Sequence, residues 1–157
     1  MKIDFTGEKV GCKLKKDIKK AVKLTLEHLK QDYKKIMLSV SFVSEEEIKE
    51  LNQRTRNIDK ITDVLSYPNF NLKPFETIDL FNKNNYLGKH VFLGDMAICL
   101  VRAGEQAKEY GQTLEKEVIK LVIHSTLHLM GFDHIQDEDY AVMNQEEEKI
   151  ASKFYTF

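Results

Sequence analysis

Cysteine, proline and tryptophan are scarce in this sequence. Its 157 residues include 2 cysteines, 2 prolines and no tryptophan. Cys12 and Cys99 are too few for a disulfide framework, so we expect a reducing, cytoplasmic setting. The longest apolar run, residues 96–101, is far shorter than the roughly 18 residues that a membrane-spanning helix requires. The N-terminus has no apolar stretch of the signal-peptide type, which argues against export.

An excess of charge of one sign is also missing. The net charge is −1 and the pI is about 6.5, which argues against a bulk, non-specific nucleic-acid binder. The charge is unevenly distributed, because residues 9–35 contain 10 lysines. A solvated helix face explains this segment, and so does a surface that attracts phosphate groups. Both interpretations stay open on the sequence alone.

The composition is otherwise that of a folded protein. Hydrophobic residues make up 42% of the chain and charged residues 31%, and 9 phenylalanines and 6 tyrosines supply bulk for a core. A chain of this length buries enough surface to fold without disulfides or metal as staples. We therefore expect a single domain, residues 1–157.

The spacing of apolar residues predicts an α+β fold, with one mixed β-sheet of about four strands and about five helices. Strand-like segments are expected at residues 3–5, 36–43, 62–67, 90–93 and 96–101. Helices are expected at residues 14–29, 44–53, 103–110, 113–130 and 137–153. Gly94 and Asp95 separate the last two strand-like segments. Ser44 and Glu47 fit the pattern of a capping box at the start of a helix. Residues 69–89 have no clear period and should form a loop or surface excursion.

Three of the five histidines lie within one 11-residue segment. His124 and His128 are four residues apart on a predicted helix, so both imidazoles leave the same face and are suited to one metal ion. Gly131 allows the helix to end and the chain to turn back, which lets His134 reach the same ion. Three neutral imidazoles with an open fourth position are typical of a hydrolytic rather than a structural metal site.

The neighbouring residues admit more than one interpretation. A lone histidine on an apolar helix is more often a core or capping residue, and only the clustering favours a metal site. Ser125 stands where the metallopeptidases with an H-E-x-x-H motif have their general base, which weakens a peptidase assignment. Asp133 is suited equally to orienting a ligand, to acting as a base, or to capping the Gly131 turn. His28 and His90 have no partner at ligand spacing.

With these residues in view, the chain resembles the YbeY family of bacterial endoribonucleases. The segment HSTLHLMGFDH, residues 124–134, is similar to the family's H-x-x-x-H-x-x-x-x-x-H signature. Residues 51–68 and 93–98 are similar to two further family motifs. The resemblance implies an α+β fold with a zincin-like metal helix, cleavage of single-stranded RNA, and roles in small-subunit ribosomal RNA maturation and ribosome quality control.

The resemblance also implies roles for individual residues. It makes His124, His128 and His134 ligands of one zinc ion per chain, and Arg56 the functional arginine. Without it, a surface salt bridge with Asp59 or Asp63 is the more usual role for an arginine such as Arg56. The sequence departs from the family pattern at two positions, where Asn57 replaces the usual glycine and Cys99 replaces a common serine. Asn57 is compatible with left-handed backbone.

The first hypothesis is therefore a zinc-dependent endoribonuclease in which the three histidines hold the metal and Arg56 grips a phosphate. Its expected partners are single-stranded precursor ribosomal RNA and the ribosome or its small subunit, with no DNA and no membrane. Asp63, Asp95 and Asp133 are possible supports of the cleft. The alternatives are a metallopeptidase-like hydrolase and a non-catalytic ribosome-assembly factor with a structural metal. Nickel, cobalt and copper would also suit three histidines.

Overall fold

A computed structural model describes residues 1–156, so Phe157, the last residue of the expected single domain, lies outside the described part. Its centre is a mixed five-stranded sheet in which the long strands follow the order β1-β2-β5-β3 and the short β4 pairs with β5. β2 is parallel to β1 and to β5, whereas β3 and β4 are antiparallel to β5. The strands are β1 (Lys2–Gly7), β2 (Ile36–Val43), β3 (Val64–Pro68), β4 (Tyr86–Leu87) and β5 (His90–Cys99).

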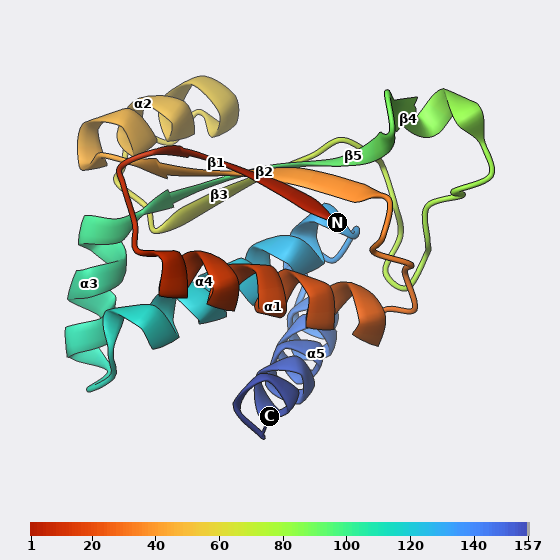
Figure 1. The fold of residues 1–157 in the computed structure, drawn as a ribbon. Helices are drawn as coiled ribbons and strands as arrows, with labels where there is room; N and C mark the ends of the chain where they lie inside the picture. Colours follow the sequence, from red (N-terminus) through yellow and green to blue (C-terminus); the bar gives the residue numbers. More distant parts are fainter. Residues whose placement is uncertain (157) are drawn as a thin grey trace.

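The helices cover both faces of the sheet unequally (Figure 1). They are α1 (Cys12–His28), α2 (Glu45–Arg56), α3 (Leu100–Glu109), α4 (Leu114–Leu129) and α5 (Asp137–Thr156). Figure 1 shows α1, α4 and α5 on one face, α2 on the other, and α3 descending from the end of β5. The α+β class with one mixed sheet and five α-helices is confirmed.

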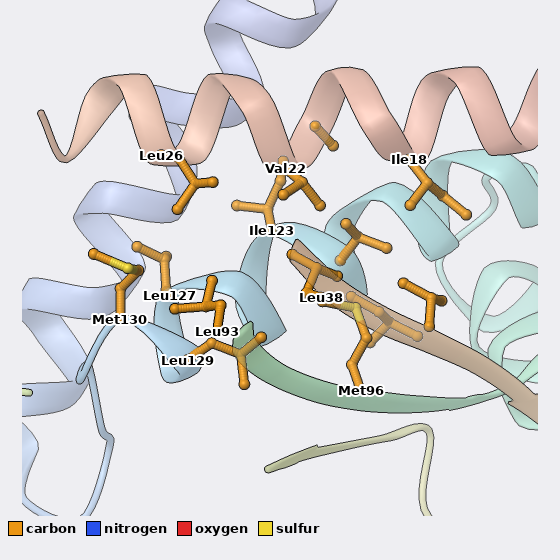
Figure 2. Packing of buried hydrophobic residues seen from close by; sticks show 14 of the residues in the cluster. Ile18, Val22, Leu26, Leu38, Leu93, Met96, Ile123, Leu127, Leu129 and Met130 are labelled. Carbon is orange, nitrogen blue, oxygen red and sulfur yellow. The ribbon is translucent and has the colours of Figure 1, made fainter. Parts of the chain in front are cut away.

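The main core lies between the sheet and the helices α1 and α4 (Figure 2). Ile18, Val22 and Leu26 recur at helical spacing along α1 and are fully buried. They face residues of α4 such as Ile123 and Leu127, and the two helices together cover β2 and β5 (Figure 2). Each such side chain contributes about 1.5–3 kcal/mol when it leaves water. This packing fixes the rotation of α4 about its axis and hence the direction of its other face.

The helices α2 and α4 each begin at a residue whose side chain caps the helix, and the sequence predicts the first of these caps, Ser44. The Ser44 side chain accepts a hydrogen bond from the Glu47 amide at the start of α2, and the Thr113 side chain accepts one from the Lys116 amide at the start of α4. α2 ends at Asn57, whose φ of 56° is left-handed. Asn57 therefore adopts the conformation that we expected it to share with glycine.

The expectation of two separate strands around Gly94 and Asp95 is wrong. β5 runs without interruption through ten residues, from His90 to Cys99. Its register with β2 shifts between Met37 and Leu38, which leaves one extra residue on β5. Gly94 has a φ of 148°, and a Cβ there would overlap the Tyr67 carbonyl oxygen of β3. The glycine therefore permits a bulge and a close approach inside the strand instead of ending it.

The remaining differences concern the ends of elements and one loop. α3 begins at Leu100, three residues earlier than expected, and α5 continues to Thr156. The segment expected as a loop contains a short 3-10 turn, Lys83–Asn85, and the two-residue strand β4. None of the helices formed by residues 1–156 is long and apolar enough to cross a membrane.

Candidate metal centre

Three imidazole rings converge at the C-terminal end of α4. His124 and His128 lie one turn apart on that helix, and His134 follows the turn at its end. One nitrogen from each ring lies within 4.8 Å of the others, and within residues 1–156 this group consists of the three histidines alone. The ring centroids are 4.6 to 5.5 Å apart. The structure therefore brings together all three predicted ligands.

The outer nitrogens of two of these rings are already bonded. Nδ1 of His128 is 2.8 Å from the Phe132 carbonyl oxygen, and Nδ1 of His124 contacts Oε1 of Glu147 on α5. A carbonyl and a carboxylate only accept hydrogen bonds, so both Nδ1 atoms carry the proton. Nε2 of each ring then has a free lone pair, and these two atoms are 3.0 Å apart. Two acceptors this close repel each other unless a cation lies beside them, so the donor set fits a metal ion.

His128 is held in the neutral form that a metal ligand requires. Burial is the main cause that lowers its pKa to about 4, and the nearby His124 contributes in the same direction. The ring is therefore unprotonated near neutral pH even before any metal binds. His124 and His134 are more open, with side chains 28% and 45% exposed. The cluster thus has two half-buried histidines, His124 and His128, and one exposed histidine, His134.

The turn after α4 depends on Gly131. Its φ is 92°, and an added Cβ would overlap the carbonyl oxygen of Leu72. The Phe132 amide donates to the Leu127 carbonyl at 3.0 Å, and the Gly131 amide donates to the His128 carbonyl at 3.0 Å. These bonds close the helix in the manner of a C-terminal cap. The turn places the Phe132 carbonyl against His128 and returns His134 to the cluster.

A cavity of about 620 Å³ opens over the three histidines. Its wall includes Arg56, the last residue of α2, whose Nη2 donates to the Ser66 carbonyl of β3 at 3.1 Å. Within residues 1–156, no carboxylate oxygen lies within 4.0 Å of this guanidinium, so the alternative salt bridge with Asp59 or Asp63 is not formed. Arg56 and the histidines therefore share one solvent-filled space.

The three candidate supporting aspartates lie in different places. Asp63 lines the cavity, and its Oδ1 accepts a hydrogen bond from the Val64 amide at 2.7 Å. Asp133 lines an adjoining cavity of about 240 Å³, and its Oδ1 accepts from the His134 amide at 2.8 Å. Asp95 accepts from the Ser39 hydroxyl and lines neither cavity. The structure therefore brings Asp63 and Asp133 to the site and leaves Asp95 away from it.

Two other features of the sequence are now placed. Ser125 is fully buried, and its hydroxyl lies 2.7 Å from the Ser66 hydroxyl of β3, so it joins α4 to the sheet and does not face the metal group.

None of the 10 lysines between residues 9 and 35 lines either cavity. Lys15 and Lys23 lie over the aromatic rings of Phe5 and Tyr33. These contacts fit a helix face in solvent.

Sequence reasoning missed Glu147. It lies in a run of three glutamates on α5, and nothing in that run distinguishes one from another. The fold assigns them different neighbours, because Glu146 contacts His28 of α1 at 2.5 Å whereas Glu147 contacts His124 of α4. The only available signal was the amphipathic pattern of α5, which indicates a buried face without naming its polar partners.

The sheet, the helix with its histidine pair and the third histidine beyond a glycine turn define an α+β protein with a three-histidine group suited to a metal-dependent hydrolase. The comparisons with known proteins identify the family. A family model described as "Endoribonuclease YbeY" matches residues 2–155, and the chain belongs to this family.

Individual relatives agree with the family match. A protein of Caldanaerobacter subterraneus named "Endoribonuclease YbeY" is 39% identical over 153 residues, covering 97% of this chain and 90% of its own. A protein of the same name from Clostridium botulinum strain Eklund 17B is 44% identical over 119 residues, covering 72% of each chain. A solution structure of a Thermotoga maritima protein superposes with a TM-score of 0.62 at 29% identity, covering 98% of this chain and 89% of that one.

Proposed function

We propose that this protein is a metal-dependent endoribonuclease that cleaves single-stranded RNA. In this proposal one zinc ion per chain is held by His124, His128 and His134, and the catalytic domain is the single domain 1–157. The substrate is precursor ribosomal RNA of the small subunit, met on or near the ribosome in the cytoplasm. The observation that carries the proposal is the convergence of three imidazoles, two with lone pairs 3.0 Å apart, in the cavity that Arg56 also lines.

The chain's own residues have separate tasks in this proposal. A zinc ion in such a site supplies Lewis acidity and lowers the pKa of a coordinated water to about 7. Glu147 and the Phe132 carbonyl hold the rings of His124 and His128 so that Nε2 faces the ion. Arg56 binds the scissile phosphate through two parallel N–H donors and stabilises the negative charge that develops during cleavage.

The geometry favours this function over its two alternatives. The buried Ser125 leaves the position next to His124 without a carboxylate base, which a peptidase of the H-E-x-x-H type requires. A structural metal would call for a fourth protein ligand, and the group formed by residues 1–156 has three members. Open coordination and a neighbouring guanidinium suit phosphoryl chemistry.

The test combines metal content with RNA cleavage. The purified wild-type protein should contain one zinc ion per chain by elemental analysis, cut a single-stranded oligonucleotide and leave its duplex intact. A chelator should stop the cleavage, and added zinc should restore it. His128→Gln should lose the bound zinc and the cleavage together.

The matched control is His90→Gln, which changes a histidine outside both cavities and should preserve zinc and cleavage. Full zinc occupancy in His128→Gln would contradict the ligand assignment. A zinc-loaded wild-type protein that cuts no single-stranded RNA would contradict the proposed activity.

A further inference from the structure

A lysine and a tyrosine form a pair on the cavity wall beyond the histidines. Lys120 of α4 and Tyr110, the residue that follows α3, both line the cavity of about 620 Å³. The Lys120 ammonium lies 5.0 Å from the centroid of the Tyr110 ring. Neither residue takes part in the candidate metal centre, so their position in the same cavity requires a separate explanation.

Helix geometry aligns Lys120 with the metal centre. Lys120, His124 and His128 follow one another at intervals of four residues along α4, and all three line the cavity. At about 1.5 Å per residue, each step moves about 6 Å along the helix axis. This interval is comparable with the distance between neighbouring phosphates in an extended single strand. A strand with one phosphate at the histidines can therefore present the next one near Lys120.

The Lys120 ammonium is available for such an anion. Among the described residues, no carboxylate oxygen lies within 4.0 Å of it, although Glu117 is one turn away in the same cavity wall. The carboxylate of Glu117 instead accepts a hydrogen bond from the Gln112 side chain, and its residue is only 1% exposed. The face of the Tyr110 ring attracts the ammonium and restricts the flexible lysine chain to the cavity wall.

We propose that Lys120, held in place by Tyr110, binds the RNA phosphate adjacent to the scissile one. This inference rests on the proposed endoribonuclease function and adds a second phosphate contact to it. The contact fixes the register of the strand in the cavity, because successive phosphates lie on the lysine and on the metal centre. A groove with cations at successive phosphates is the usual means of following a single-stranded backbone.

The first test measures binding, independently of cleavage. A fluorescent single strand with 2′-O-methyl and phosphorothioate modifications resists cutting and keeps its charges, and its affinity for zinc-loaded protein is measured by anisotropy at several salt concentrations. Loss of one phosphate contact reduces the magnitude of the negative slope of log K against log salt by about 0.7 for a single strand. We expect that reduction for Lys120→Met. Tyr110→Leu should reduce the affinity less than Lys120→Met, because it frees the ammonium without removing it.

The chain offers a closely matched control on the same helix. Lys116 of α4 lies 5.8 Å from the centroid of the Tyr155 ring, and neither residue lines the cavities described above. Lys116→Met and Tyr155→Leu remove the same kinds of group and should leave the slope and the affinity unchanged. Equal slopes for Lys120→Met and the wild type would overturn the phosphate contact. Equal losses of affinity in Lys116→Met and Lys120→Met would also overturn it, because they would show a general effect of positive charge.

The second test locates the contact on the RNA. A cleavable strand carries one uncharged methylphosphonate, placed in turn on each side of the cleaved linkage. One placement should lower kcat/KM of the wild type and have no further effect on Lys120→Met, whereas additive losses at both placements would overturn the proposal. A wild-type protein that binds the strand but never cuts RNA would contradict the endoribonuclease function, whereas the salt slope of Lys120→Met would still decide whether Lys120 contacts a phosphate. A wild-type protein that binds no single strand would contradict both.

Discussion

Arg56 is fixed in the cavity wall by one hydrogen bond to the Ser66 carbonyl and by no carboxylate among residues 1–156. A guanidinium in this situation retains donors for a phosphate. Its neighbour Arg54, on the same helix, points to solvent, where it lies 4.0 Å from Glu50. Arg56 therefore faces the cavity, whereas Arg54 faces solvent. Substituting each arginine in turn distinguishes an effect on the cavity from a general effect of losing a surface charge.

Arg56→Ala should leave zinc content intact and change the free energy of unfolding by about 1 kcal/mol or less, since one partly exposed hydrogen bond is lost. It should lower the rate of RNA cleavage by about 100-fold or more, as the loss of a donor at a developing charge usually does. Arg56→Lys should recover little, because an ammonium cannot form the two parallel bonds. Cleavage kinetics and zinc analysis measure both effects. Arg54→Ala is the control, and a cleavage loss of the same size there would contradict the assigned role.

Glu147 acts on the metal centre through His124. Its carboxylate accepts the Nδ1 proton of that ring in a hydrogen bond, which leaves Nε2 facing the other two histidines and would increase its basicity toward the proposed zinc ion. Glu147→Gln should weaken zinc binding by about 10- to 100-fold. Competition with a chromophoric chelator measures this affinity. The adjacent Glu148 is exposed, so Glu148→Gln should bind zinc as the wild type does, and unchanged zinc affinity in Glu147→Gln would contradict the role of Glu147.

At the scale of single elements, the turn after α4 is the most constrained part of the site. Gly131 has a left-handed backbone and also lies against the Leu72 carbonyl, so two separate requirements select glycine there. Gly88 also has a positive φ, of 65°, but nothing lies within 4 Å of the place where its Cβ would be. An alanine at position 88 would therefore cause backbone strain alone, whereas an alanine at position 131 would cause backbone strain and steric overlap together.

Gly88→Ala should lower the free energy of unfolding by about 1–2 kcal/mol, the cost of a left-handed alanine. Gly131→Ala should cost clearly more, because the Leu72 segment must also move, and it should weaken zinc binding through displacement of His134. Urea unfolding at equilibrium gives both values. Equal losses in the two variants would show that the Leu72 contact has no energetic effect.

The elements that the sequence predicted well are those with a strong local signal. β2 has the predicted bounds because its alternation is strict, and α2 begins beside the predicted cap Ser44. Gly94 in β5 was wrongly predicted to end a strand, because glycine next to aspartate is typical of a turn. Glycine is required there because the Tyr67 carbonyl, distant in the sequence, leaves no room for a Cβ. The histidine triad was predictable from spacing, whereas Glu147 and Lys120 required the packing of α5 and α3 on α4.

Across the whole molecule, the site is assembled from segments that are far apart in the chain. The end of α2, the strand β3, the helices α3 and α4 and the helix α5 all contribute to one cavity. The sheet and the α1–α4 core hold these segments together (Figures 1 and 2). The 10 lysines of residues 9–35 line neither cavity, so any attraction of RNA by them acts at a distance and is sensitive to salt.

His128 of the candidate metal centre also makes the stability of the metal-free protein depend on pH. Burial lowers the pKa of His128 to about 4 in the folded state, whereas an unfolded histidine titrates near 6.5. Between these pH values the imidazole of His128 binds a proton in the unfolded chain but not in the folded protein. This residue therefore lowers the free energy of unfolding as the pH falls from about 6.5 to about 4. It contributes nothing above that range, and its contribution is constant below it.

The chelated protein should therefore lose up to about 3 kcal/mol between pH 7.5 and pH 4 through His128, at about 1.4 kcal/mol per pKa unit, and less where solvent reaches the ring. Urea unfolding of the wild type and of His128→Gln, both in chelator, measures the difference, since all other titrating groups are shared. The variant should show a smaller loss over the same interval. Parallel pH dependences would mean that the ring has the same pKa in the folded and unfolded states, which would contradict the effect of burial on His128.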